Sequence, residues 1–140
     1  MPLSAQKIAS LVDGKTTESA TWEAEGLSTD TRTLGENQLF AALIGEKFDG
    51  HHFATNALEK GAAGLLVSRV VEGIPAEKQI IVPDTLEAMA TLGAKLRAGF
   101  RGRVIGITGS AGKTTTREGV KAVLSHFGKT YGTEKNYNNH

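Results

Sequence analysis

One segment of the sequence combines glycines, hydroxyl residues and a lysine in a pattern that binds the phosphates of a nucleotide. Gly109 and Gly112 allow the backbone to turn so that successive N–H groups face phosphate oxygens, and the helix predicted to follow adds the positive end of its dipole. Lys113 can reach the β- and γ-phosphates and is the candidate catalytic residue, while Thr114 offers a hydroxyl to Mg²⁺. The candidate nucleotide-binding residues are Thr108, Gly109, Ser110, Ala111, Gly112, Lys113, Thr114 and Thr115.

The spacing of this segment leaves other interpretations open. A strict phosphate-binding loop has glycine at position 107, where this sequence has Ile107, and Gly106 comes one place early. Gly106, Gly109 and Gly112 also approach a dinucleotide fingerprint, in which Glu134 would bind a ribose. A lysine in this place serves additional phosphates, so the segment favours a nucleoside triphosphate over a dinucleotide. The structural alternative is a glycine-rich turn with an incidental lysine.

The elements that must position this segment alternate between strands and helices. Hydrophobic runs predict strands at 39–43, 65–67, 80–82 and 104–107. Periodic apolar residues and capping residues predict helices at 4–12, 52–60, 84–100 and 114–127. This alternation is typical of an α/β fold with a mostly parallel sheet, and the most natural break in the chain is Pro83–Asp84. The aromatic residues expected in a core are Trp22, Phe40, Phe53, Phe100, Phe127 and Tyr131.

The composition of the 140 residues indicates a globular protein and excludes several classes. Hydrophobic residues make up 39% and charged residues 22%, and the net charge is +1, so neither disorder nor a nucleic-acid-coating function is indicated. The sequence has no cysteine, which excludes disulfides and thiol catalysis and fits a reducing compartment. We expect a cytoplasmic protein, because there is no secretory signal and no apolar run long enough to span a membrane.

Four segments occur in an order that resembles the Mur ligases. They are Ser28–Arg32, Gly45–Phe53, Thr108–Thr115 and Asn136–His140, and together they span most of the chain. Each motif is moderately specific alone, and the ordered set is highly specific. The Gly-x-x-Phe-Asp-Gly-His pattern and the final Tyr-Asn-Asn are most similar to the family members that add D-alanyl-D-alanine.

The resemblance implies a division of the chain into two parts. Residues 1–83 would form a small α/β domain that binds the UDP-muramyl peptide. Residues 84–140 would supply the first strand, the phosphate-binding loop and the helix of a parallel-sheet ATPase domain. Because family members have three domains, we expect these 140 residues to be an amino-terminal piece that is incomplete for catalysis by itself.

The resemblance also assigns substrate-binding roles. Two segments would line the UDP pocket, and the segment at 136–139 would contact the muramyl or peptide part. The candidate substrate-binding residues are Ser28, Asp30, Arg32, Phe48, Gly50, His51, Asn138 and Asn139. Thr31 stands where serine is commoner in the family, and Lys135 replaces a glycine.

The residues themselves allow simpler interpretations of two of these segments. Asp30 and Arg32 could form an ion pair in a solvated turn. His51 and His52 are adjacent, and adjacent residues rarely bind one ion, so capping or surface histidines are favoured over a metal site. The only metal-binding residue that we predict is Thr114.

The implied activity is ATP-dependent amide formation in peptidoglycan precursor synthesis. The substrates would be UDP-N-acetylmuramoyl-tripeptide and D-alanyl-D-alanine, joined through an acyl phosphate, with ATP and Mg²⁺ as cofactors. We expect a monomer that acts on small molecules, with no nucleic-acid partner and no insertion into membranes. The alternatives are another Mur-type ligase, a relative of folylpolyglutamate synthase, and a UDP-sugar-peptide-binding module without catalysis. The order of the motifs argues against an unrelated phosphate-loop switch.

Overall fold

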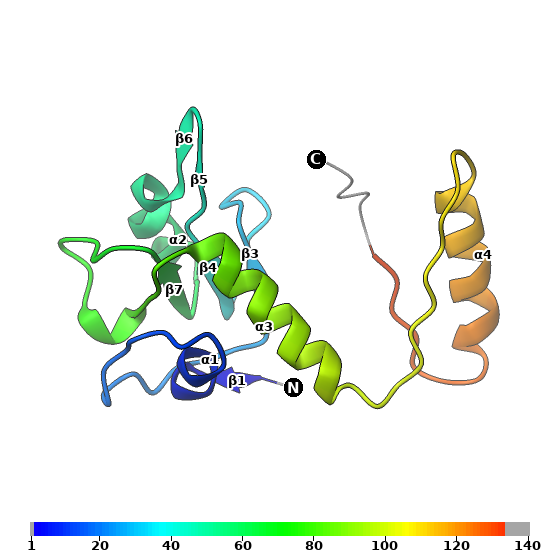
Figure 1. The fold of residues 1–140 in the computed structure, drawn as a ribbon, viewed down its shortest axis with the longest axis horizontal. Coiled ribbons are helices and arrows are strands. Elements are labelled where there is room, and N and C mark those ends of the chain that lie inside the picture. Colours follow the sequence, from blue (N-terminus) through cyan, green and yellow to red (C-terminus); the bar gives the residue numbers. More distant parts are fainter. Residues whose placement is uncertain (1, 134–140) are drawn as a thin grey trace. The chain divides into compact units, whose positions relative to one another are not determined.

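The computed structural model describes residues 2–133 and divides the chain into two compact units, Met1–Phe100 and Arg101–His140 (Figure 1).

The first unit is built on a parallel four-stranded sheet. Its strands are β3 (Gly26–Ser28), β4 (Gln38–Ala41), β7 (Gly64–Val67) and β8 (Gln79–Ile81), and they lie in the order β3-β4-β7-β8. Each neighbouring pair is parallel, with Leu39 opposite Leu27 and Gly64, and Leu66 opposite Ile80. The predicted α/β fold with a parallel sheet is therefore confirmed. All four residues of β7 are buried, as expected for a strand covered on both faces.

Helices cover both faces of this sheet. α1 (Ala5–Leu11) and α3 (Thr85–Gly99) share one apolar cluster with the β4 and β7 residues Leu39 and Leu66. α2 (Ala54–Glu59) packs on the opposite face, against Phe40 and Leu65. Alternate residues of each strand thus point into different clusters, as the two-residue period of a strand requires.

The helices α1 and α3 begin at the capping residues that the sequence indicates. The Ser4 hydroxyl accepts a hydrogen bond from the Lys7 backbone N–H at the start of α1. The Asp84 carboxylate accepts from the N–H groups of Leu86 and Glu87 at the start of α3, at 2.8 and 2.9 Å. These bonds satisfy donors that the first turn of a helix leaves without an internal partner.

Short elements complete the first unit. β1 (Leu3–Ser4) pairs with β2 (Glu23–Ala24), and β5 (Ile44–Gly45) forms an antiparallel hairpin with β6 (Phe48–Asp49). The 3₁₀ helices η1 (Gly50–Phe53) and η2 (Ala76–Lys78) precede α2 and β8. Outside these elements, Lys15 and Ile81 exchange two backbone hydrogen bonds of 2.8 Å along the outer side of β8.

The contacts of α3 group it with the first unit. Ala88 and Leu92 of α3 are buried in the cluster that contains Ile8 of α1. The compact unit therefore ends at Phe100, whereas the sequence analysis divides the chain at Pro83–Asp84. The assignment of substrate binding to 1–83 and of nucleotide binding to 84–140 stays a prediction.

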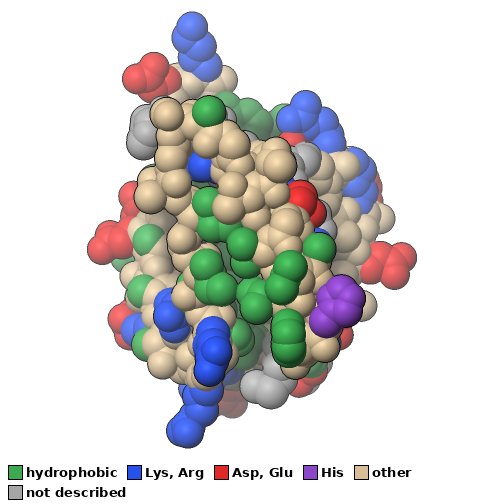
Figure 2. Space-filling model, turned by 90° about the vertical axis from the view of Figure 1, so that its right-hand side faces the viewer, with side chains coloured by type: hydrophobic (Ala, Val, Ile, Leu, Met, Phe, Trp, Pro, Cys, Tyr) green, Lys and Arg blue, Asp and Glu red, His purple; other side chains and the backbone are tan. Residues whose placement is uncertain are grey.

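The second unit contains α4 (Lys113–Ser125), close to the helix predicted at 114–127. The strand predicted at 104–107 is wrong for this structure, because these residues take no regular conformation. A strand exists only where a neighbour completes its hydrogen bonds, and Val104 and Ile105 remain 57% and 56% exposed. Hydrophobic side chains are visible among charged and polar groups on the face of the molecule that Figure 2 shows.

The prediction of aromatic core residues is only partly right. Phe40 is buried and Trp22 is half-buried, with its indole Nε1 donating to the Glu77 carbonyl at 2.7 Å. The other aromatic residues predicted in the core are exposed, and they are Phe53, Phe100, Phe127 and Tyr131. Within residues 2–133, no helix is long and apolar enough to cross a membrane.

Candidate functional site

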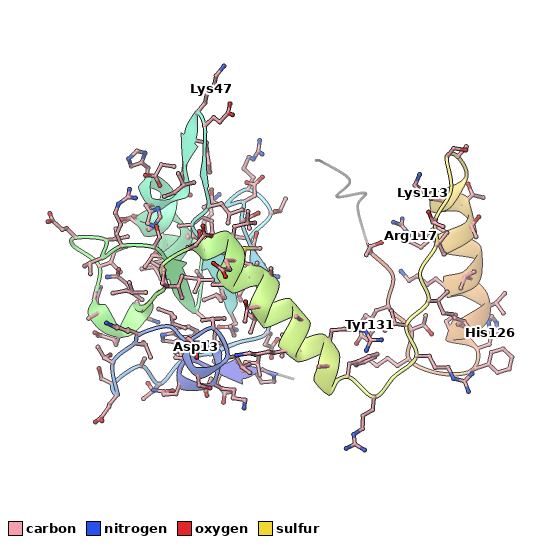
Figure 3. All side chains as sticks on the ribbon, in the orientation of Figure 1. Asp13, Lys47, Lys113, Arg117, His126 and Tyr131 are labelled. Carbon is pink, nitrogen blue, oxygen red and sulfur yellow. The ribbon has the colours of Figure 1, made fainter. Side chains whose placement is uncertain are left out.

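The glycine-rich segment of the second unit forms a turn that opens directly into α4. Gly109 has a φ of 151° and Gly112 has a φ of 75°, a range in which residues with a Cβ are strained. Gly112 is the residue immediately before the helix, so Lys113 begins its first turn (Figure 3). The backbone N–H groups at the start of a helix and the positive end of its dipole make this a suitable place for an anion.

Lys113 folds back across this turn. Its ammonium group donates to the Gly109 carbonyl at 2.5 Å, so the positive charge lies above the segment that the two glycines shape. The Gly112 carbonyl accepts from the Thr116 N–H as the first hydrogen bond of the helix. A cation and the N-terminal N–H groups of α4 therefore lie on one short loop, as phosphate binding requires.

The second candidate region lies in the first unit, where the loops leave the carboxyl ends of the parallel strands. The chain leaves β3 at Ser28, β4 at Ala41, β7 at Val67 and β8 at Ile81. Because the strands are parallel, all four exits are at one edge of the sheet, which is where ligands bind in open α/β sheets. Figure 1 shows the β5–β6 hairpin projecting beyond the sheet there. We call this region the carboxyl edge.

At the end of β3, Ser28, Asp30 and Arg32 form a compact turn. The Ser28 hydroxyl donates to the Asp30 carbonyl at 3.0 Å and accepts from the Asp30 N–H at 3.2 Å. The Asp30 carboxylate accepts from the Arg32 backbone N–H at 2.8 Å and from its guanidinium at 2.6 Å. The ion pair that the sequence allowed as an alternative is therefore present.

This ion pair leaves the arginine accessible. The Arg32 side chain is 86% exposed, and the hydrogen bond that its guanidinium donates to the Asp30 carboxylate raises the pKa of Arg32 above the ordinary value. A fully charged guanidinium held by a neighbouring carboxylate presents its remaining donors to solvent in a fixed direction. The pair is thus compatible with both readings, a solvated turn and a diphosphate ligand.

After β4, the β5–β6 hairpin and η1 together carry two exposed aromatic side chains and one tightly packed glycine. Phe48 of β6 stacks on Phe53 of η1, with ring centroids 5.4 Å apart and an interplanar angle of 18°. The Gly50 N–H donates to the Leu43 carbonyl at 2.7 Å. A Cβ on Gly50 would lie 2.8 Å from the Leu43 backbone and 2.9 Å from the Ala42 Cα, so only glycine fits without a shift.

His51 lies inside the protein rather than on its surface. Its side chain is 3% exposed. The ring Nε2 accepts from the Ser68 backbone N–H at 3.0 Å, so Nε2 carries no proton and Nδ1–H donates to the Asp49 carboxylate at 2.7 Å. Both ring nitrogens are thus bonded within the chain, and His51 connects η1 to Asp49 and to the residue that follows β7.

Asp49 connects this histidine to a second arginine. Its carboxylate caps η1 by accepting from the His51 N–H at 2.9 Å, and its other oxygen accepts from Arg69 at 2.5 Å. The Arg69 contact, followed by the His51 backbone bond, holds the pKa of Asp49 well below its usual range. The carboxylate is therefore ionised at neutral pH.

Ser68 and Arg69 lie outside the sequence motifs and were not predicted as site residues. The available signal was a polar pair placed directly after the buried strand β7, which topology brings to the carboxyl edge. Within the described part of the chain, no three His, Asp or Glu residues gather as a metal site would require. The predicted ligands Asn138 and Asn139 lie outside the described residues.

Comparisons with known proteins bear on both regions. A family model described as "Mur ligase family, catalytic domain" matches residues 23–97, which include the carboxyl edge but not the glycine-rich turn. A Synechocystis protein named UDP-N-acetylmuramoyl-tripeptide–D-alanyl-D-alanine ligase is 48% identical over 114 residues, covering 81% of this chain and 25% of the relative. The chain spans about a quarter of the length of the curated relatives it matches.

Solved structures agree in fold. A crystal structure of MurF from Acinetobacter baumannii has a TM-score of 0.76 and 32% identity, and covers 99% of this chain and 31% of that one. The MurF ligase of Thermotoga maritima in complex with ADP has a TM-score of 0.61 and 28% identity, and covers 88% of this chain and 28% of that one.

Proposed function

The chain belongs to the Mur ligase family. We propose that it is part of an ATP-dependent amide ligase that joins D-alanyl-D-alanine to UDP-N-acetylmuramoyl-tripeptide in peptidoglycan precursor synthesis. The observation that carries the proposal is the turn at Gly109–Gly112, which opens into α4 with Lys113 folded above it. The names of the relatives supply the substrates, and the ADP complex of the Thermotoga relative supports an adenine nucleotide.

In this proposal the two parts of the chain predicted from the sequence, 1–83 and 84–140, have different roles. The carboxyl edge of the first unit binds the UDP end of the substrate through Ser28, Asp30 and Arg32, with Phe48 and Gly50 shaping the hairpin beside them. His51 holds that hairpin in place. Residues 84–140 begin the ATP-binding domain, with 108–115 around the phosphates, and Asn138 and Asn139 contact the muramyl or peptide part.

The reaction is a phosphoryl transfer from ATP to the peptide carboxylate, followed by attack of the D-alanyl-D-alanine amine and release of phosphate. Lys113 neutralises charge on the transferred phosphoryl group, and the N–H groups that begin α4 hold the phosphate chain in position. No residue of this chain acts as a nucleophile. The acceleration of the reaction comes from positioning of the substrates and neutralisation of their charge.

The residues present fit a magnesium ion as part of that site. Thr114 follows Lys113 at the start of α4, and its hydroxyl oxygen is the kind of ligand that Mg²⁺ prefers. When bound, the ion would neutralise negative charge on the phosphates of ATP. We further propose that the protein is monomeric and cytoplasmic, in keeping with a cysteine-free sequence.

The experiment that tests the function is ligation by the complete gene product with the Lys113→Ala substitution. Loss of the cation should abolish formation of the pentapeptide product while binding of UDP-N-acetylmuramoyl-tripeptide, measured by calorimetry, is unchanged. Lys121→Ala removes a positive charge from the exposed side of the same helix and should leave ligation unaffected. Ligation by the Lys113 variant at the parent rate would refute the proposed function.

A further inference from the structure

Arg69 is a second exposed arginine at the carboxyl edge, and the sequence motifs give it no role. It follows β7, two strands away from the turn that holds Arg32. Neighbouring strands lie about 4.8 Å apart, so the ends of β3 and β7 are about 10 Å apart, within reach of two arginine side chains that converge on one ligand. The Arg69 side chain is 51% exposed.

The direction of Arg69 is fixed by a closed set of hydrogen bonds. The Ser68 N–H donates to His51 Nε2, His51 Nδ1 donates to Asp49, and Asp49 accepts from Arg69, the residue next to Ser68. The Ser68 hydroxyl adds a 3.2 Å contact to the same ring nitrogen. These hydrogen bonds therefore connect the β5–β6 hairpin to the end of β7. They start at Ser68 and end at its neighbour Arg69.

This arrangement suits the binding of an anion better than a purely structural ion pair. The bond to Asp49 engages one amino group of the guanidinium, and the half-exposed remainder of the fork keeps donors that match a phosphate. Asp30 holds Arg32 in the same manner. Two arginines, each oriented by its own aspartate, thus lie on loops of the same edge, where a negatively charged ligand would neutralise both.

We propose that Arg69 binds the diphosphate of the UDP-linked substrate opposite Arg32, and that Asp49 and His51 are positioning residues that aim it. This inference rests on the proposed function, since the diphosphate belongs to the substrate named there. The inference adds a binding residue from the loop after β7 to a site that the sequence motifs place only on the loop after β3 and on the segment Gly45–Phe53.

The test measures binding of UDP, uridine and UDP-N-acetylmuramoyl-tripeptide to the 140-residue chain by calorimetry. Arg69→Gln should weaken UDP and the full substrate about tenfold each, the size of one charge-assisted hydrogen-bonded contact, and should leave uridine within about twofold. The control variant Lys47→Gln removes a positive charge from the exposed tip of the β5–β6 hairpin (Figure 3). It should change all three affinities by less than about twofold.

A double-mutant cycle tests the positioning role. If Asp49 acts through Arg69, Asp49→Asn should weaken UDP binding in the parent but add nothing when Arg69 is already glutamine. Additive losses would overturn the positioning role.

Three outcomes separate the possible failures. UDP affinity unchanged by Arg69→Gln would overturn the Arg69 assignment and leave the proposed function standing. A loss confined to the tripeptide substrate would also overturn it, because Arg69 would then bind a peptide carboxylate. Failure of the unsubstituted chain to bind both UDP and the full substrate would instead refute the proposed substrate.

Discussion

Replacing Gly50 by alanine tests whether the start of η1 packs tightly against the backbone of Ala42 and Leu43, which follow β4. A Cβ at this position would lie 2.8 Å from the Leu43 nitrogen and oxygen and 2.9 Å from the Ala42 Cα, all of them backbone atoms that cannot rotate away. Overpacking of this kind costs about 1–3 kcal/mol. We take about 2 kcal/mol, which corresponds to a fall in the melting temperature of about 8–16 °C for a domain of this size.

Gly45, in the β5–β6 hairpin that directly precedes η1, provides a matched control. A Cβ there would meet only the Phe48 carbonyl oxygen, at 3.9 Å. Neither Gly45 nor Gly50 has a positive φ, so alanine lowers the conformational entropy of the unfolded chain equally at both positions. Only the steric contact in the folded state differs between the two variants. Gly45→Ala should keep the parent stability within about 0.5 kcal/mol.

The single tryptophan gives the assay. Trp22 is half-buried in the first unit and bonded to the Glu77 carbonyl, so its fluorescence during urea denaturation reports the unfolding of that unit. Equal stability of the Gly50→Ala and Gly45→Ala variants would show that the start of η1 does not press on Ala42–Leu43. The steric reasoning about the site would then be refuted.

The other predictions concern a helix cap and a carboxylate. Asp84→Ala should destabilise the first unit by about 1 kcal/mol in urea denaturation, because two N–H groups of α3 lose their acceptor, and Asp84→Asn should restore most of the loss. Asp49→Asn should lower stability at neutral pH. Because the folded-state pKa of Asp49 lies below its unfolded value, the stability it contributes is complete above that value and is lost as the pH falls through the lowered pKa. The difference between parent and Asp49→Asn, from denaturation at several pH values, should therefore shrink below about pH 4, and a constant difference would contradict the assignment.

Local signals predicted α1, α3 and the strands β4, β7 and β8 of the first unit. Ser4 and Asp84 cap their helices because capping depends on the next three residues alone. The strands β7 and β8 follow from short apolar runs that are buried on both sides. β3 was missed because its three residues contain a single apolar side chain, Leu27, and its strand conformation depends on pairing with β4.

Errors arose where the outcome depends on distant neighbours. The apolar run at 104–107 and the exposed Phe127 have the composition of a core, but composition alone does not supply the elements that would cover them. At the site, the Asp30–Arg32 pair was foreseeable from spacing. The bond between His51 and Ser68 was not, because it joins residues that only the parallel crossover brings together.

The strand-like contact between Lys15 and Ile81 has a consequence for solubility. Exposed margins of a sheet recruit further strands from other molecules, which leads to aggregation. By exchanging two backbone hydrogen bonds with Ile81 of β8, the exposed residue Lys15 occupies the groups that an incoming chain would need there. The sheet is thereby shielded along one flank by a single residue of an otherwise irregular segment.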